Sequence, residues 1–324
     1  MLSNPISTKN MWNKKRYHSF DYACKKRFGT KLYKLSLNAG FSCPNRDGTL
    51  DTRGCIFCSA GGSGDFAPDK TLSITEQIAQ AKQLVAAKNP SGRYIAYFQA
   101  YTNTYAPIPT LERVFFEAAE NPEIASIAIA TRPDCLNAEV LSLLSRLNSM
   151  LPVSVELGLQ TIHEKSAEFI RRGYPLRVYE DAVRSLAAIR VDIVTHLILG
   201  LPYETTADML ASVRHVCSLP LSGLKLSLLY VLKGTDLAAH YAAHQNAYPL
   251  MDFSAYLDAL LSCLSIVPED IVIHRLTGDG PKKLLIAPDW SGNKKFVLNS
   301  MEKEMKRRDF RQGISCPEIP HENK

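Results

Sequence analysis

Residues 31–62 read KLYKLSLNAGFSCPNRDGTLDTRGCIFCSAGG, a short apolar run followed by a loop that carries three cysteines. Cys43, Cys55 and Cys58 are spaced as Cys-x11-Cys-x2-Cys. A two-residue gap lets both sulfurs of a pair reach one metal centre, and the eleven-residue gap brings the third sulfur round without a tight turn. Three cysteine ligands on a four-iron cluster leave one iron open to another molecule. The stretch therefore predicts a metal centre directly after a first strand.

The alternation of strand and helix continues along the rest of the chain. Short β-branched or apolar runs alternate with amphipathic stretches, which predicts parallel strands joined by helical crossovers. Six such units are expected, with strands near 31–38, 93–99, 126–131, 153–159, 192–199 and 224–230, followed by an apolar strand at 271–276. Helices are expected from Ser73, which forms a capping-box pattern with Glu76, and near 110–120, 137–148, 163–171, 176–189, 206–218 and 253–264. A single α/β barrel with N- and C-terminal extensions is the simplest fold, and its chemistry belongs in the loops after the strands.

A structural zinc site is the alternative use of the three cysteines. Structural zinc is usually closed and tetrahedral, so a fourth ligand would have to come from Cys24, His18 or another distant residue. The sequence has no second Cys-x2-Cys pair or paired histidines to supply one. The position after the first strand of an α/β pattern favours a cluster with an open iron.

The composition is that of an ordinary globular protein, with 324 residues, 46% hydrophobic and 22% charged. No stretch approaches the roughly 18–20 apolar residues of a membrane span, and the start lacks the apolar core of a signal peptide. A cytoplasmic location without a membrane partner is therefore expected. Eight cysteines in such a chain argue against a disulfide framework. No second cluster is expected, because five cysteines lack paired spacing: Cys24, Cys135, Cys217, Cys263 and Cys316.

Positive charge is concentrated near the two ends of the chain. Residues 1–34 hold nine Lys or Arg and one acid, and residues 294–311 hold seven bases and three acids, whereas the net charge of the whole chain is only +6. Basic clusters attract polyanions, so nucleic acid is one interpretation. Solvated terminal helices are the other.

The ordered motifs resemble the radical S-adenosylmethionine (SAM) superfamily, whose partial (β/α)6 TIM-like barrel carries three cysteines after its first strand. That superfamily usually has Cys-x3-Cys-x2-Cys with an aromatic residue before the last cysteine; this chain keeps Phe57 but lengthens the first gap. Such a gap is expected of the branch with the YhcC/YtqA-like proteins and the radical subunit of Elongator. The resemblance spans about 16–290 and is carried by RFGTKLYKLSLNAGFSCPNRDGT (27–49), YFQAYTNTYAP (97–107), TRPDCL (131–136), ELGLQ (156–160) and HLILGLP (196–202).

The resemblance implies one 4Fe–4S cluster on Cys43, Cys55 and Cys58, with SAM on the open iron. It also implies that four residues at strand ends contact SAM. Thr102 matches the threonine of a Gly-Gly-Thr motif, although the glycines are replaced by Ala100 and Tyr101; Gln160 and Arg172 have the spacing of a Gln and an Arg in oxygen-independent coproporphyrinogen oxidases; His196 stands where those oxidases have an aspartate. An Arg suits this role because its planar guanidinium binds a carboxylate bidentately.

Several of these polar residues also have structural interpretations. Thr102 and Gln160 are consistent with ordinary loop or capping positions, and His196 with a satisfied core histidine. Glu156 is either a buried partner for Lys225 or a substrate contact. The remaining ambiguous residues either serve the site or form core contacts and ion pairs: Arg132 with Asp134, and His274 and Arg275 in the strand at 271–276.

The resemblance implies that a reduced cluster cleaves SAM and that the resulting 5′-deoxyadenosyl radical abstracts a substrate hydrogen. A transfer RNA (tRNA) wobble uridine is the expected substrate, with flavodoxin or ferredoxin as the kind of electron donor. A radical enzyme for a small metabolite or protein, and a non-catalytic zinc or RNA-binding module, are the alternatives. The expected division is a basic N-terminal extension (1–30), a radical SAM core (31–235) and a C-terminal extension packed on the barrel with a basic tail (236–324).

Overall fold

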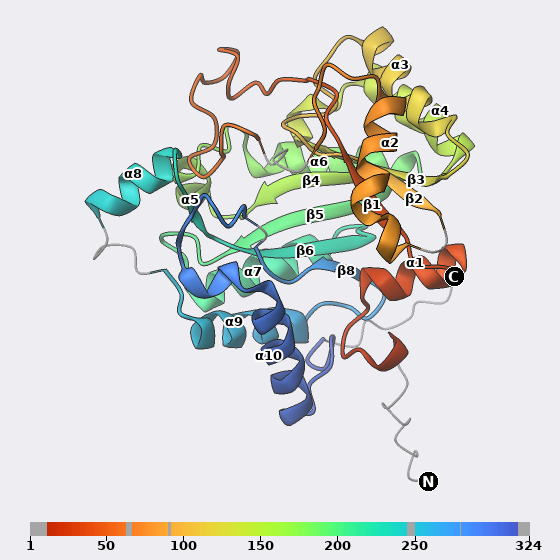
Figure 1. Ribbon diagram of the computed structural model, residues 1–324. Coiled ribbons are helices and arrows are strands. Elements are labelled where there is room, and N and C mark those ends of the chain that lie inside the picture. The colour runs from red at the N-terminus through yellow and green to blue at the C-terminus, as the bar shows by residue number, and fades with distance from the viewer. Residues whose placement is uncertain (1–11, 63–66, 90–91, 245–249, 279, 317–324) are drawn as a thin grey trace.

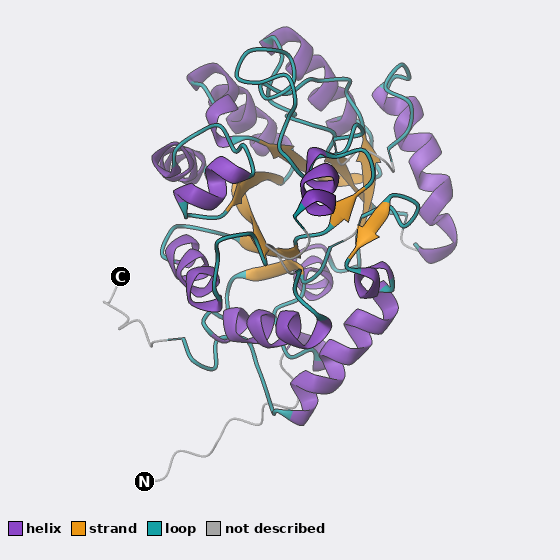
Figure 2. Cartoon of the chain, turned by 90° about the vertical axis from the view of Figure 1, so that its left-hand side faces the viewer, coloured by secondary structure: helices purple, strands orange, loops and turns teal. Residues whose placement is uncertain are grey.

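A computed structural model describes residues 12–62, 67–89, 92–244, 250–278 and 280–316 (Figure 1). Its main sheet has seven parallel strands in the order β1-β2-β3-β4-β5-β6-β8. All seven expected strands are confirmed: β1 (Tyr33–Leu37), β2 (Tyr94–Phe98), β3 (Ile124–Thr131), β4 (Val153–Gln160), β5 (Asp192–Leu199), β6 (Gly223–Leu228) and β8 (Val272–Arg275). The sheet curls into an open barrel with helices around it (Figure 2). The predicted fold class, a partial barrel of the α/β type, is therefore confirmed.

The helices that cover the sheet lie where the sequence predicts them. These are α2 (Ile74–Val85), α3 (Ile108–Ala119), α4 (Ala138–Met150), α5 (Glu164–Phe169), α6 (Leu176–Ala188), α7 (Thr206–Cys217) and α9 (Phe253–Ser265). Ser73 and Glu76 form the predicted capping box at the start of α2. Elements without a specific prediction are α1 (Phe20–Phe28), α8 (Asp236–Ala243), α10 (Lys294–Arg307), the 3-10 helices η2 (Ala86–Lys88), η3 (Pro133–Cys135) and η4 (Asp289–Gly292), and an antiparallel pair, β7 (Val231–Leu232) with β9 (Leu285–Ala287). None of the helices in the described ranges is long and apolar enough to cross a membrane.

The two faces of the sheet bury different chemistry. The outer face carries aliphatic side chains such as Leu35, Ile127 and Leu197, which pack against the helices in one large core. A smaller apolar cluster lies inside the barrel, where Ile95 and Ala128 pack against Cys24 of α1. Helix α1 therefore closes one end of the barrel. The rest of the interior is polar.

A buried carboxylate ties five strands together inside the barrel. Glu156 of β4 has a fully buried side chain, and its Oε1 lies 2.6 Å from Lys34 Nζ of β1. Its Oε2 accepts hydrogen bonds from Tyr97 of β2 at 2.8 Å and from Lys225 of β6, and lies 3.1 Å from His196 Nε2 of β5. The structure thus gives Glu156 the first of its two predicted roles, a buried partner of Lys225.

The charges of this cluster are set by burial and mutual attraction. Burial by itself would raise the pKa of Glu156, but the charges of Lys225 and Lys34 hold that pKa well below its ordinary value. Burial and the positive charge of Lys225 lower the pKa of His196 to about 4, so its imidazole is neutral at pH 7. One ionised acid therefore lies between two lysines, with a neutral histidine beside it.

The two ends of the described chain are joined by a buried glutamine. Gln312 is fully buried; its Oε1 accepts the backbone N–H of His18 at 2.9 Å, and its Nε2 donates to the carbonyls of Pro268 and Ile271 at 2.7 and 2.9 Å. Its backbone N–H bonds to the carbonyl of Arg16 at 2.9 Å. Of the predicted basic ends, Lys9 lies outside the described residues; the described part of the N-terminal one packs against the C-terminal region. The predicted boundaries at 30/31 and 235/236 stay predictions.

Replacing Glu156 should destabilise the barrel. In Glu156→Gln, Lys34 and Lys225 remain close together without a carboxylate between them, so the free energy of unfolding should fall by about 3–5 kcal/mol. Urea denaturation of the full chain measures the change. The control is Glu302→Gln on the surface of α10, which breaks exposed ion pairs with Lys15 and Lys306 and should cost less than about 1 kcal/mol. Equal losses in the two variants would contradict the assigned role of Glu156.

Replacing Gln312 should separate the two ends of the chain. Gln312→Met keeps the approximate volume but leaves one N–H and two carbonyls buried without partners, each costing about 1–3 kcal/mol. We expect a total loss of at least about 3 kcal/mol in a thermal or urea unfolding experiment. Gln83→Met, on an exposed face of α2, should change stability by no more than about 0.5 kcal/mol. A Gln312→Met protein as stable as the wild type would show that these bonds do not hold the ends.

Candidate active site

The cysteine loop folds back on itself, so that its long first gap spans a short distance. The N–H of Gly54 bonds to the carbonyl of Asn45 at 2.6 Å, and the N–H of Leu50 bonds to the carbonyl of Pro44 at 2.8 Å. Gly54 has a φ of +77°, and a Cβ there would come within 2.8 Å of the Arg46 side chain, so the closure requires glycine. Cys43 and Cys55, which flank this closed loop, are thereby brought together despite the eleven residues between them.

The three thiols of the loop lie near enough to affect one another electrostatically. The N–H of Cys58 bonds to the carbonyl of Cys55 at 2.9 Å, which makes the Cys-x2-Cys segment a turn. Burial, with smaller contributions from Cys58 and Cys43, raises the pKa of Cys55 to about 12. Thiolates in this position need a compensating positive charge, and bound metal supplies one, so the donor set fits a thiolate-ligated group. Within the described ranges, no three His, Cys, Asp or Glu side chains are arranged to hold a single metal ion.

The loop after β2 fastens both ends of the cysteine loop. The N–H of Thr102 bonds to the carbonyl of Ser42 at 3.2 Å, next to Cys43, and the N–H of Tyr101 bonds to the carbonyl of Gly62 at 3.0 Å. The Tyr101 hydroxyl also donates to the carbonyl of Ala60. Thr102, a predicted SAM contact, is thus buried directly beside the cysteine loop.

A buried arginine follows β3 on the same side of the barrel. Arg132 makes a bidentate pair with Asp134, at 2.9 Å from Nε and 2.7 Å from Nη2, which is the ion pair considered from the sequence. Its guanidinium lies over the Tyr174 ring, 5.1 Å from the centroid. It also interacts electrostatically with Cys55 and Cys43. Arg132 therefore contributes positive charge near the thiols.

The segment after α5 packs against the other side of the cysteine loop. Asn45 Nδ2 donates to the carbonyl of Arg171 at 2.7 Å and lies 3.5 Å from the sulfur of Cys55. The N–H of Ile56 bonds to the carbonyl of Ile170 at 3.2 Å. Arg171 Nη1 reaches Asp236 at the start of α8 at 2.5 Å. The loop is thus held from three directions, by residues after β2, after β3 and after α5.

The predicted SAM contacts do not all lie in the same environment. Gln160 ends β4 in the left-handed region, with a φ of +71°, at an irregularity in the pairing with β5. Arg172 is only 2% exposed, and its guanidinium donates to the carbonyls of Thr161 and Tyr174 at 2.6 and 2.8 Å and to Glu164 at 3.0 Å. His196 belongs to the Glu156 cluster inside the barrel. A contact of Gln160, Arg172 or His196 with SAM stays a prediction.

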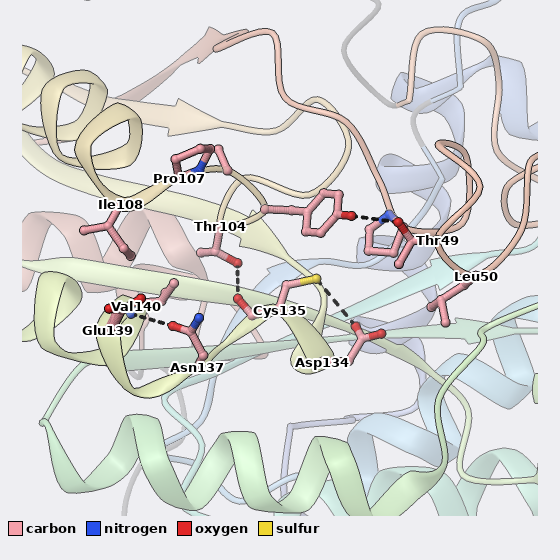
Figure 3. A pocket seen from close by; sticks show the side chains of 13 residues that line it. Thr49, Leu50, Thr104, Pro107, Ile108, Asp134, Cys135, Asn137, Glu139 and Val140 are labelled. Atoms are coloured by element: carbon pink, nitrogen blue, oxygen red, sulfur yellow. Dashed lines mark hydrogen bonds between the residues drawn. The ribbon is translucent and has the colours of Figure 1, made fainter.

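A cavity of about 720 Å³ opens between the cysteine loop and the loops after β2 and β3 (Figure 3). Thr49 of the cysteine loop bonds to the Tyr105 hydroxyl at 2.9 Å across it. Thr104 donates to the carbonyl of Cys135 at 2.7 Å. The cavity is large enough for a small molecule and adjoins the thiol-bearing loop.

Sequence reasoning missed the residues that position the loop. Asn45 and Arg46 directly follow the first cysteine and its proline, and the Arg46 Nη2 donates to the carbonyls of Cys58 and Ser59, at 2.9 Å each. Tyr101 was noted only as a departure from a glycine motif. The adjacency of Asn45 and Arg46 to Cys43 was the available signal, but their bonds depend on the folded loop.

Comparisons with known proteins agree with this arrangement. Residues 52–216 match the Radical SAM superfamily, and residues 221–307 match the Radical_SAM C-terminal domain. The chain is 40% identical to the uncharacterized protein YtqA of Bacillus subtilis, over 97% of this chain and 96% of that protein. It is 35% identical to the protein YhcC of Escherichia coli, over 83% of this chain and 85% of that protein.

More distant relatives include proteins of the Elongator type. The tRNA uridine(34) acetyltransferase of Methanocaldococcus jannaschii is 24% identical, over 63% of this chain and 37% of that protein. The solved structure of Elp3 from Methanocaldococcus infernus has the same fold, with a TM-score of 0.64 at 14% identity, covering 87% of this chain and 64% of that one. The predicted cofactors, a 4Fe–4S cluster and SAM, are those of the matched superfamily. The chain belongs to the radical SAM superfamily of enzymes, within the group that includes YtqA and YhcC.

Proposed function

We propose that this enzyme uses a 4Fe–4S cluster on Cys43, Cys55 and Cys58 to cleave SAM and modify a wobble uridine of tRNA. The observation that carries the proposal is the folded cysteine loop, which brings three thiols together and is held by the loops at the carboxyl ends of β2 and β3. When bound, the reduced cluster supplies the electron that splits SAM into methionine and a 5′-deoxyadenosyl radical, which removes a hydrogen atom from the substrate.

The residues around the thiols would stabilise their negative charge. Asn45 Nδ2 lies 3.5 Å from the Cys55 sulfur, within reach of a weak hydrogen bond. Arg46 interacts electrostatically with Cys58 and Cys43. Fixed donors and positive charges near sulfur ligands tune the potential of an iron–sulfur centre. We assign Asn45 and Arg46 this positioning role.

Four residues are proposed to contact SAM, on different grounds. Thr102 has support from its bond to the cysteine loop at Ser42. Gln160 ends β4 on the same side of the barrel. For Arg172 and His196 the support is the sequence resemblance alone, since both side chains already have partners within the protein.

The tRNA substrate is supported by relatives and by charge. A relative of this chain is a tRNA uridine(34) acetyltransferase, although the identity is low. The two basic segments meet in the fold, through Arg16 with Asp309 at 2.6 Å and Lys15 with Glu302 at 3.0 Å. We place the enzyme in the cytoplasm, with flavodoxin or ferredoxin as electron donor, because tRNA and such donors are found there.

Each of the three cysteines should be required for the cluster. Cys43→Ala, Cys55→Ala and Cys58→Ala should each lose the visible absorbance of the anaerobically reconstituted protein and form no detectable 5′-deoxyadenosine with dithionite and SAM. Cys135→Ala is the matched control, because this half-buried thiol lies near Cys43 but outside the loop. It should keep both signals. A variant of the three that kept a full cluster would remove that cysteine from the ligand set.

The substrate class can be tested in cells. Deleting the gene should change the modified wobble uridine in tRNA hydrolysates analysed by mass spectrometry, and a plasmid copy should restore it. The Cys55→Ala gene should fail to restore it, while the Cys135→Ala gene should succeed. Unchanged tRNA nucleosides in a strain whose purified enzyme cleaves SAM would instead favour a small metabolite or a protein as substrate.

A further inference from the structure

The edges of the curled sheet leave a seam between its first and last strands. β1 and β8 end the strand order, so the barrel is open between them. Residues 18–19 lie along β8, where the N–H of Ile273 bonds to the carbonyl of His18 at 2.7 Å, and α1 follows (Figure 1). A cavity of about 420 Å³ remains in the seam, bounded by β1, β8, the start of α1 and α10. None of the three loop cysteines lines it.

The cavity has an excess of positive charge. Lys34, Lys225 and Arg275 line it, and Glu156, behind Lys34 and Lys225, is the acid that balances them. Asp21 also lines the cavity but pairs with Lys25 at 2.8 Å. Three bases against one buried acid leave a surplus that an anionic ligand would neutralise.

Three buried polar atoms at this cavity have no hydrogen-bond partner. They are the hydroxyl of Thr277, which is 2% exposed, Nδ1 of His274 and Oδ1 of Asp21. Buried polar groups are nearly always satisfied, so three such atoms around one cavity indicate a bound polar molecule. The Asp21 oxygen can only accept, which requires a donor on the ligand in addition to its anionic group.

Aromatic and aliphatic side chains complete the lining. Tyr17, Phe20 and Tyr97 present rings to the cavity, with Leu276 and Leu298. Such rings suit a flat, conjugated group. The ligand should therefore combine an aromatic ring, hydrogen-bond donors and an oxyanion.

The mouth of the cavity lies between the two basic segments of the chain. Lys15 and Lys294, one from each segment, are among its lining residues. Neighbouring contacts hold the segments together, through Arg16 with Asp309 and Gln312 with Arg16. Positive charge on both sides of the mouth favours a phosphate-bearing ligand over a carboxylate without further charge.

We propose that the seam between β1 and β8 is a binding site for a pyrimidine nucleotide, with the phosphate toward the lysines and Arg275 and the ring among the aromatic side chains. The choice of a pyrimidine rests on the proposed tRNA function; nucleotide binding as such does not. The nucleotide is either free or part of an RNA, and the chemistry of recognition is the same for both.

Calorimetric titration of the reconstituted full chain with uridine 5′-monophosphate, in the presence of saturating SAM, tests the site. Arg275→Gln should weaken binding by at least about tenfold, because a contact with a charged group is lost. Thr277→Val, which removes only the unpartnered hydroxyl, should weaken it by about three- to tenfold. Arg307→Gln, on the exposed end of α10, should leave the affinity unchanged. Thermal unfolding of each variant verifies folding, and Thr277→Val removes no existing bond in the described structure.

The proposal is overturned if the wild type does not bind the nucleotide, if all four proteins bind it equally, or if SAM displaces it. It is also overturned if inorganic phosphate binds as tightly, because the rings would then contribute nothing. Competition by an RNA hairpin would identify RNA as the source of the nucleotide, and site-dependent binding without such competition would identify a free nucleotide; either supports the site. SAM cleavage is measured separately, so a loss of radical chemistry with intact nucleotide binding would reject the proposed function and leave this inference standing.

Discussion

The carboxylate of Glu156 constrains the whole barrel, because an ionised acid inside a protein must be surrounded by donors and positive charge. Its partners come from β1, β2, β5 and β6, so the curvature of the sheet and the position of one side chain depend on each other. A flat sheet could not bring Lys34 and Lys225 to the same carboxyl group. The closed α1 end and the open seam both follow from a barrel built around this charge.

The cysteine loop explains why a long gap is compatible with the chemistry of a three-cysteine motif. The loop between Cys43 and Cys55 closes on itself through Asn45 and Gly54, so the extra residues form a surface excursion. Its two ends remain neighbours. The bonds to the loop after β2 and to the segment after α5 then fix this closed unit over the barrel.

The sequence predicts the strands well because buried parallel strands are continuous apolar runs, and apolar runs can be identified without tertiary information. Helix α10 carried a comparable signal, since Val297, Met301 and Met305 are spaced by four residues and are all buried. Its many charges favoured the interpretation as a solvated tail. The left-handed conformation of Gln160 and the internal bonds of Arg172 could not be predicted, because they depend on the segments that these residues meet only after folding.

The bonds of Gln312 also bear on how this protein is made. His18 and Arg16 leave the ribosome early, but the side chain that binds them is synthesised nearly three hundred residues later. Throughout translation the first helix lacks this anchor, and the inner apolar cluster that it covers has no fixed lid. Completion of the barrel is therefore a post-translational event, and a nascent chain that stalls before its last turn leaves the ribosome with an unsealed interior.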